Sequence, residues 1–249
     1  MTARDPFQAP RVQSRRGGPV KQPLSRDAIV SEALRLLTSE GLEGMSLRKV
    51  AAALETGPAS LYAYVEDLDE LRALVLDRAL AKVDVRAGEG ADWSAGVRAV
   101  LESYSRVLSA SPGLAQLAFG TIAVGPSALR VTEALLGLLA QGGVEPETRA
   151  WAVDLLILQV TAVVAEHAGG LEPAAPDGRV ARAVAGASER DYPQIHATRA
   201  HLLSGTGAER FAWAIDVLLQ GIQRVPRAPP GSAPRASSRR AGKSPRRTR

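Results

Sequence analysis

The chain has 249 residues, of which 45% are hydrophobic, and a net charge of +5. This length is enough for one good core, or for a small domain joined to a larger one. Because the sequence has no cysteine, disulfide frameworks, Cys-ligated zinc, iron–sulfur clusters and thiol catalysis are excluded.

The charge is unevenly distributed along the chain. Residues 1–26 carry six Lys or Arg against one Asp, and residues 224–249 carry nine against none. Residues 27–87 and 88–223 have net charges of −4 and −5. Two basic ends therefore flank an acidic middle. Basic arms are a common source of sequence-independent attraction to DNA phosphates, and the alternative is that they serve solubility alone.

Neither a membrane span nor a signal peptide is expected. No apolar run reaches the roughly 18 residues of a membrane helix, because Asp154 and Gln159 interrupt the most apolar stretch. The basic residues near the N-terminus are not followed by a hydrophobic segment, as they are in a signal peptide. We therefore expect a cytoplasmic protein.

The two ends of the chain are predicted to be disordered. Residues 1–23 are rich in Pro, Gly, Arg and Gln and lack apolar periodicity. Residues 226–249 form a second low-complexity segment, rich in Pro, Ser and Arg. We interpret them as a basic arm and a basic tail.

Residues 24–87 are predicted to form a domain of short helices. Ser25 is the expected N-cap of the first helix and Gly41 its end, and Ser46 is the expected N-cap of the second. Apolar residues between these positions recur at helical spacing.

Two more helices complete this first domain. Pro58 suits the first position of the third helix, because its missing N–H is not needed there. Asp67 or Asp69 is expected to start a fourth helix, which runs to about Arg86.

Residues 88–225 are predicted to form a second, larger helical domain. Residues 169–187 are rich in Gly, Pro and Ala and are interpreted as a loop. Alternating β-branched runs are missing, so the predicted fold class is all-α. The expected helices are Trp93–Leu108, Leu114–Phe119, Ser127–Gln141, Pro146–Ala168, Gln194–Leu203 and Glu209–Arg224.

The segment from Gly41 to Leu71 has the spacing of a helix-turn-helix. A support helix and a short second helix are joined by a tight turn, and the second helix begins with small residues. In this arrangement the N-terminal end of the second, recognition helix enters the DNA major groove. Ala51 is expected to face the turn, where a larger side chain would separate the helices.

Three ordered pieces stand out in and around this segment, which are Gly41-Leu42-Glu43-Gly44, Ser46-Leu47-Arg48-Lys49-Val50-Ala51 and Ala59-Ser60-Leu61-Tyr62-Ala63-Tyr64-Val65. With these pieces the sequence resembles the TetR family of bacterial repressors. The resemblance covers about Leu24 to Leu76.

The resemblance implies DNA-contacting roles for residues of the support and recognition helices. It also implies that Leu61 and Val65 hold the recognition helix in the core. Taken alone, the two tyrosines fit ordinary amphipathic packing better, and the alternative for the two basic residues is a solvated face. The implied contact residues are Arg48, Lys49, Pro58, Ala59, Ser60, Tyr62 and Tyr64.

The sequence departs from the family pattern in two places. Glu55 stands where many members have Gly, and a left-handed backbone there would cost about 1 kcal/mol. Residues 66–70 contain no Lys or Arg where many members have a phosphate-binding Lys, although their acidic side chains suit a helix N-terminus.

The basic arm is a hypothetical replacement for that missing phosphate contact. Its cations include Arg11, Arg15, Arg16 and Lys21. If they contact DNA, deletion of residues 1–23 weakens operator binding and flattens its salt dependence. Unchanged affinity at low and high salt would contradict the hypothesis.

The resemblance also implies a homodimer that binds a palindromic double-stranded DNA operator and responds to a small-molecule effector. The dimer interface would be a four-helix bundle formed by Pro146–Ala168 and Glu209–Arg224 of each subunit. The candidate pocket residues, each of which also suits a plain core, are Tyr104, Leu108, Leu117, Phe119, Trp151, Leu155 and Gln159.

No cofactor, metal or catalytic activity is predicted. His167, His196 and His201 offer too few ligands at workable spacing for a metal site. Gly-rich phosphate loops, nucleophile elbows and His-Glu metal motifs are missing from the sequence. The alternatives left open are a helical enzyme, a ligand-binding scaffold without DNA affinity and a nonspecific DNA-binding protein.

Overall fold

The computed structural model describes Phe7 and residues 24–168 and 178–225. The predicted disorder of residues 1–23 and 226–249, and the arm cations, lie outside these residues. Within them the chain forms eleven α-helices, one 3-10 turn and no strand, so the predicted all-α class is confirmed. The elements are α1 (Arg26–Glu40), η1 (Leu42–Gly44), α2 (Leu47–Ala53), α3 (Pro58–Leu61), α4 (Leu68–Leu80), α5 (Trp93–Leu108), α6 (Pro112–Gly120), α7 (Pro126–Gln141), α8 (Pro146–Ala168), α9 (Gly178–Ala185), α10 (Pro193–Leu202) and α11 (Gly207–Arg224).

The starts of the first helices are where local capping chemistry predicts them. The side chains of Ser25, Ser46 and Asp67 each accept an N–H from the first turn of the helix that follows. Pro58 occupies the first turn of α3. Each cap satisfies a backbone donor that has no partner inside its helix.

Helix α4 ends at Leu80, and the expected end near Arg86 is wrong. The carbonyls of Ala81 and Val83, just after the helix, accept hydrogen bonds from the Arg130 guanidinium, at 2.9 and 3.3 Å. A side chain from another helix therefore satisfies acceptors that a longer α4 would have used itself.

The expected loop over residues 169–187 is also partly wrong. Helix α9 covers Gly178–Ala185, and residues 169–177 lie outside the described part. Val180 and Val184 recur at helical spacing among alanines and arginines, a pattern hidden by the Gly and Pro that precede it. None of the residues of α9 or α10 is buried.

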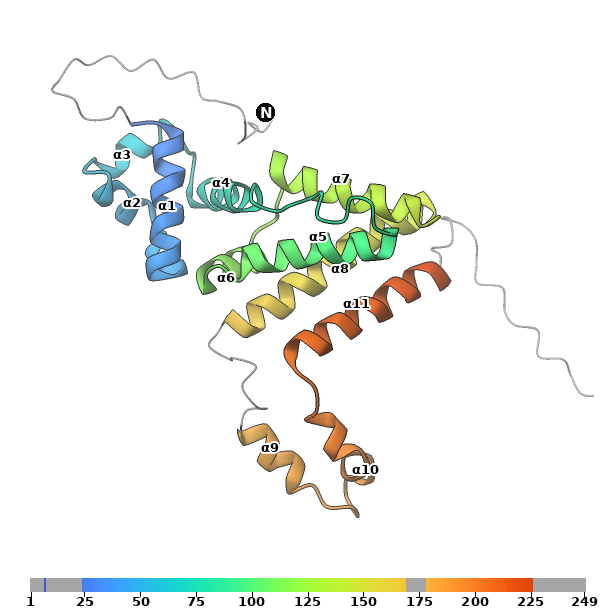
Figure 1. Cartoon of the computed structure of the whole chain (residues 1–249). Helices are drawn as coiled ribbons and strands as arrows, with labels where there is room; N and C mark the ends of the chain where they lie inside the picture. Colours follow the sequence, from blue (N-terminus) through green and yellow to red (C-terminus); the bar gives the residue numbers. More distant parts are fainter. Residues whose placement is uncertain (1–6, 8–23, 169–177, 226–249) are drawn as a thin grey trace, which may run out of the picture.

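The helices form a small N-terminal group and a larger bundle (Figure 1). Helices α1, α2 and α3 lie together at one end, and α4 runs from them into the bundle of α5, α6, α7 and α8. Helix α11 lies along α8, while α9 and α10 pair with each other away from the bundle. Buried apolar residues continue from Ile29 in α1 to Ile222 in α11.

Helix α8 is the central helix of the bundle. It packs against α5, α6, α7 and α11. By length and composition alone, Pro146–His167 is apolar enough to cross a membrane. Ala152, Leu156 and Val160 are nevertheless buried against the other helices, so part of this apolar surface is used in the protein core.

Candidate DNA-binding surface and ligand cavity

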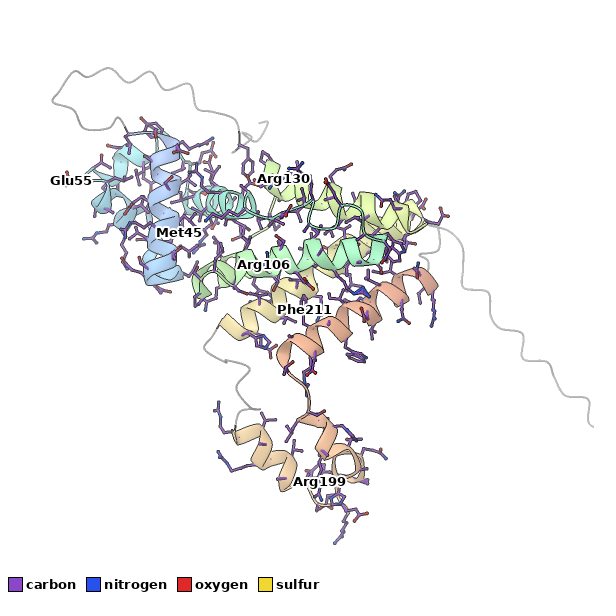
Figure 2. All side chains as sticks on the ribbon, viewed as in Figure 1. Met45, Glu55, Arg106, Arg130, Arg199 and Phe211 are labelled. Carbon is purple, nitrogen blue, oxygen red and sulfur yellow. The ribbon has the colours of Figure 1, made fainter. Side chains whose placement is uncertain are left out.

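A tight turn sets the angle between the support and recognition helices. The N–H of Thr56 donates to the carbonyl of Ala51 at 2.9 Å, and that of Glu55 to Ala52 at 3.0 Å. Glu55 has a φ of 49°, the left-handed conformation expected for this position. Ala51 is fully buried, which allows α2 and α3 to approach closely. Figure 2 shows Glu55 at the outer edge of this region.

The recognition helix α3 has one buried and one exposed side. Leu61 in α3 and Val65 just after it are completely buried. Pro58, Ala59 and Ser60 are exposed, as are the first residues of a helix that can approach a DNA groove. The core therefore fixes α3 while its N-terminal end faces solvent.

The two tyrosines that follow α3 differ in their exposure to solvent. Tyr62 is 56% exposed, whereas Tyr64 is half-buried and packs against the core. Tyr62 is therefore free to contact DNA without first leaving a packed position, and Tyr64 has a structural role as well.

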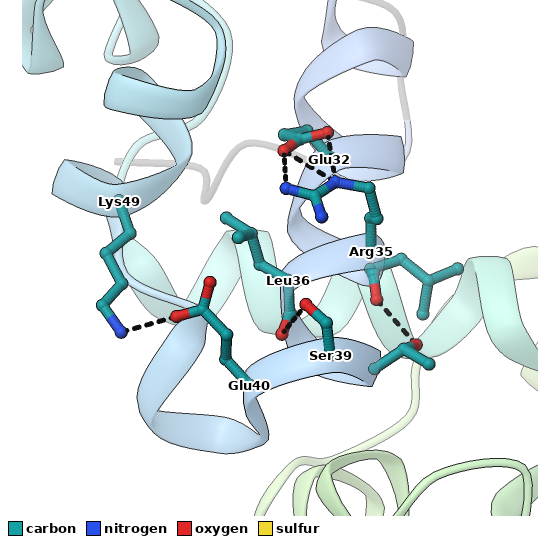
Figure 3. Close-up of polar contacts among 8 residues, drawn as sticks. Glu32, Arg35, Leu36, Ser39, Glu40 and Lys49 are labelled. Atoms are coloured by element: carbon teal, nitrogen blue, oxygen red, sulfur yellow. Dashed lines mark hydrogen bonds and ion pairs between the residues drawn. The ribbon is translucent and has the colours of Figure 1, made fainter.

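The two basic residues of α2 also differ. Lys49 is exposed and forms an ion pair with Glu40 near the end of α1, with Nζ and Oε2 2.8 Å apart (Figure 3). Arg48 is exposed and has no ion-pair partner among the described residues. Arg48 is therefore the cation of this surface whose charge is not already offset.

Acidic side chains in the segment after α3 form hydrogen bonds that hold the fold together. The Glu70 carboxylate accepts from the Arg26 guanidinium at 2.6 Å and from the backbone N–H of Glu66. Arg26 also donates to the carbonyl of Tyr64 at 3.2 Å. The Arg26 and Glu70 side chains are only 13% and 9% exposed. These bonds tie the end of the recognition segment, residues 58–65, to the starts of α1 and α4. Acidic residues therefore serve structure at the place where many family members have a phosphate-binding Lys.

A cavity of about 590 Å³ lies in the bundle. Leu76 and Leu80 of α4 form one wall, and Val131 of α7 and Val153 of α8 form others. The helix that follows the recognition segment therefore also encloses the cavity, so a molecule in the cavity would contact α4 directly.

Polar groups enter the cavity at a few points. The hydroxyls of Tyr104 and Thr161 are hydrogen-bonded at 2.9 Å. Burial raises the pKa of the Tyr104 phenol above its ordinary value, and the bond to Thr161 opposes this rise. Asp154 of α8 also lines the cavity.

Two of the seven candidate pocket residues, Tyr104 and Phe119, line this cavity. Leu108 and Leu117 do not, because their side chains are buried in the core. The remaining three also lie outside the lining: Trp151 and Leu155 are exposed on α8, and Gln159 is partly exposed there. Asp154 and Thr161 were missed, although both are polar residues within the most apolar stretch of α8.

Helices α4 and α7 cap each other. The Oδ1 atom of Asp77 in α4 accepts the N–H groups of Ser127 and Ala128 in the first turn of α7, at 2.8 and 3.1 Å. Gly125, the N-cap of α7, provides no side-chain cap, and a Cβ there would overlap the Asp77 carboxylate. Arg130 of α7, labelled in Figure 2, returns the contact at the end of α4. We call these contacts the α4–α7 clamp.

Helices α8 and α11 share an exposed apolar face. On α8 it contains Trp151, Leu155 and Leu158, and on α11 it contains Trp213 and Val217. The two helices pack against each other (Figure 1), and these side chains are exposed on them. Exposed apolar side chains gathered on adjacent helices are typical of subunit interfaces.

Comparisons with known proteins agree with this architecture. The family described as "Tetracyclin repressor-like, C-terminal domain" matches residues 87–225. The transcriptional repressor DrrR1 of Streptomyces coeruleorubidus is 38% identical over 130 residues, which cover 51% of this chain. The chain spans about half the length of this curated relative, at 48%.

Two solved structures from Streptomyces coelicolor are similar over most of the chain. The transcription regulator SCO7704 is 41% identical with a TM-score of 0.71, covering 84% of this chain and 100% of its own. The TetR family protein ActR, solved in complex with actinorhodin, is 30% identical with a TM-score of 0.72, covering 81% and 97%.

The fold and site define a helix-turn-helix transcription regulator with a helical C-terminal domain. Within that class, the chain belongs to the TetR family.

Proposed function

We propose that this protein is a homodimeric repressor that binds a palindromic DNA operator and is released from it by a small-molecule effector. One observation carries the proposal: α4 follows the recognition segment directly and also forms a wall of the apolar cavity. We propose that the protein acts in the cytoplasm and catalyses no reaction.

The DNA-contacting surface consists of residues from α2 and α3. Arg48 supplies a cation without an ion-pair partner in the described part of the chain, and Tyr62 supplies an exposed aromatic ring. Pro58, Ala59 and Ser60 form the small, exposed start of the recognition helix. Small residues there allow the backbone to approach base edges, and Arg48 can contact phosphate or a base.

Dimerisation supplies the second recognition helix. In a two-fold dimer built on α8 and α11, the two α3 helices would face half-sites about 34–36 Å apart, one helical turn of DNA. The exposed apolar face of α8 and α11 supports this arrangement.

Effector binding would act as a population shift. A molecule between α4, α7 and α8 would favour the position of α4 that best fits it. If that position changes the separation of the recognition helices, the dimer no longer fits adjacent half-sites. The complex of ActR with actinorhodin supports a small-molecule role for the equivalent fold.

A gel shift tests the proposal. The full chain is titrated onto the intergenic DNA beside its own gene, with an unrelated fragment of equal length as the control. We expect a discrete shifted band on the intergenic fragment, and Arg48→Ala to weaken it about tenfold. Equal binding to both fragments would identify a nonspecific DNA-binding protein, and the absence of binding to either would identify a scaffold.

A further inference from the structure

A second groove lies where the helix-turn-helix group meets the bundle. It encloses about 400 Å³ and is lined by side chains of α1, α4 and α7 and by Phe7. Val30 of α1, Leu74 of α4 and Pro126 of α7 form its apolar part, and the first two are buried. We call it the α1–α4–α7 groove. It spans the joint between the DNA-binding helices and the bundle.

The ring of Phe7 lies against the fold at this joint. Phe7 is partly buried and packs against the hydrophobic core. A Cβ on Gly125 would overlap both the Asp77 carboxylate and the Phe7 ring. Glycine at the start of α7 therefore leaves room for the two side chains together. The ring is seated directly beside the α4–α7 clamp.

The charged groups that line the groove or flank it already have partners in the fold. Asp27 pairs with Arg78, and Arg26 pairs with Glu70 at 2.6 Å. The Asp77 carboxylate accepts the N–H groups of the first turn of α7. Because these groups are paired, the groove favours an uncharged apolar side chain over an ion.

The sequence around Phe7 suits it to this groove. Phe7 is the only aromatic residue among residues 1–23. Pro6 precedes it and Pro10 follows three positions later, and proline lowers the conformational freedom that a chain loses on docking. The segment joins α1 through Leu24, which also packs against the core. A tether of this length gives an effective concentration on the order of millimolar, so that a single ring can hold the segment.

We propose that the α1–α4–α7 groove is the docking site of this chain's own N-terminal segment, with Phe7 as its anchor. The docked ring contacts α4 and the start of α7 together, so it favours the arrangement of these helices seen in the α4–α7 clamp. The segment is then a strap across the joint, in addition to carrying basic residues. Docking requires neither operator nor effector, so this inference goes beyond the proposed function.

Photo-crosslinking tests the docking directly. Phe7→p-benzoylphenylalanine is introduced into the full chain, which is irradiated without DNA, digested with trypsin and analysed by mass spectrometry. We expect crosslinks to the tryptic peptides 27–35, 73–78 and 107–130, which contain Val30, Leu74 and Pro126. Val12→p-benzoylphenylalanine is the control and should not favour these peptides.

Three outcomes of this experiment would overturn the docking. The first is labelling of other peptides by the Phe7 variant, and the second is equal labelling of the groove peptides by both variants. The third is crosslinking only between two chains, which gives a product of twice the mass on a denaturing gel.

A mutant cycle tests whether the ring stabilises the joint. Phe7→Ala should lower the melting temperature by about 2–4 °C, and Phe7→Leu, which keeps an apolar contact, should lower it less. In the Gly125→Ala background the effect of Phe7→Ala should shrink, because the new methyl group takes the place of the ring. In the Gly137→Ala background it should persist, since a Cβ there meets no neighbouring atom within 4 Å. No effect of Phe7→Ala, or the same effect in both backgrounds, would overturn the proposal.

Hydrogen exchange tests whether the docked ring restrains the α4–α7 clamp. The N–H groups of Ser127 and Ala128 donate to Asp77, so Phe7→Ala should speed their exchange about threefold and leave exchange in α11 unchanged. An unchanged rate at the start of α7 would overturn the strap.

The anchor and the basic residues of the segment can be separated by substitution. Phe7→Ala keeps the cations, whereas alanine at Arg11, Arg15, Arg16 and Lys21 keeps the anchor. We expect only the charge variant to flatten the salt dependence of operator binding, and only Phe7→Ala to lower the melting temperature. Equal flattening by Phe7→Ala would overturn its role at the groove.

The proposed function and the strap fail separately. Crosslinking, melting and hydrogen exchange are all measured without DNA. Loss of the repressor function would therefore leave the docking of Phe7 standing. Crosslinks outside the groove together with intact operator binding would reject the strap alone.

Discussion

At the residue scale, the turn of the helix-turn-helix contains a strained position. Glu55 has a left-handed backbone, which costs a non-glycine residue about 1 kcal/mol. The strain is tolerated because two backbone hydrogen bonds of the turn, donated by Glu55 and Thr56, fix the chain there. The helix-turn-helix therefore retains its geometry without the glycine of the family pattern.

Removal of this strain should stabilise the protein. We expect Glu55→Gly to raise the free energy of unfolding by about 1 kcal/mol relative to Glu55→Ala, measured by urea denaturation. The alanine variant is the control, because it loses the same carboxylate but keeps the left-handed backbone. A glycine variant no more stable than the alanine variant would show that the turn is unstrained.

Variants of two neighbouring residues, Leu61 and Tyr62, should separate effects on stability from effects on DNA binding. Tyr62 is exposed, so Tyr62→Ala should leave the melting temperature unchanged and weaken operator binding about tenfold, measured by fluorescence anisotropy. Leu61 is fully buried, so Leu61→Ala should lower the free energy of unfolding by about 2–5 kcal/mol. A destabilised Tyr62→Ala protein would mean that Tyr62 is a packing residue.

At the scale of elements, the α4–α7 clamp joins the helix after the recognition segment to the cavity wall. Asp77 supplies the N-cap that Gly125 lacks, and Arg130 supplies the acceptor contacts at the end of α4. The opposite charges also suit the partial charges of the two helix ends. The clamp holds both walls at a fixed separation on one side of the cavity.

A double-mutant cycle tests the clamp. We expect Asp77→Ala to lower the free energy of unfolding by about 1 kcal/mol, the usual cost of a lost N-cap. Gly125→Ala should destabilise the native protein because its methyl group would overlap Asp77 and the Phe7 ring. It should cost less in the Asp77→Ala background, where only the overlap with Phe7 remains.

Gly137→Ala is the matched control for this cycle. Gly137 lies within α7, and a Cβ there would meet no neighbouring atom within 4 Å. It should therefore stabilise α7 by about 0.5–1 kcal/mol in either background. Equal costs of Gly125→Ala with and without Asp77 would show that the two residues do not interact.

The sequence predicted the elements whose causes are local. Ser25, Ser46 and Pro58 mark helix starts because a cap or a missing N–H acts within one turn. The end of α4 could not be predicted in this way, because it depends on Arg130, 47 and 49 residues away from the carbonyls that it binds.

The candidate site also has one part that could be predicted from the sequence and one part that could not. The recognition helix is recognisable because its residues are adjacent in the sequence. The cavity is assembled from five helices, and no local pattern distinguishes the buried core residue Leu108 from the cavity residue Tyr104, both in α5. Asp154 is the exception, since a charge within an apolar helix is visible in the sequence.

At the scale of the whole molecule, the exposed apolar face of α8 and α11 is expected to be the dimer interface. Trp213→Asp on α11 places a charge in that face and should shift the protein from dimer to monomer in analytical ultracentrifugation. Leu129→Asp on α7 is the control, because Leu129 is equally exposed but outside the face. A dimeric Trp213→Asp protein, or a monomeric Leu129→Asp protein, would place the interface elsewhere.

The distribution of charge along the chain is also a property of the whole molecule. Residues 27–87, which include the helix-turn-helix, have a net charge of −4, although their fold is that of a DNA-binding domain. Several of these acids pair with cations or cap helices, as Glu70, Asp67 and Glu40 do. The geometry of α3 and a few exposed groups such as Arg48 would then determine where the protein binds.

A DNase I footprint of the full chain on the intergenic fragment tests most directly whether paired α3 helices recognise an operator. We expect two protected half-sites, related by an inverted repeat and centred about one helical turn apart. Tyr62→Ala should lose both half-sites together. Protection without phasing, or protection of a single unrepeated site that survives Tyr62→Ala, would contradict recognition by paired α3 helices.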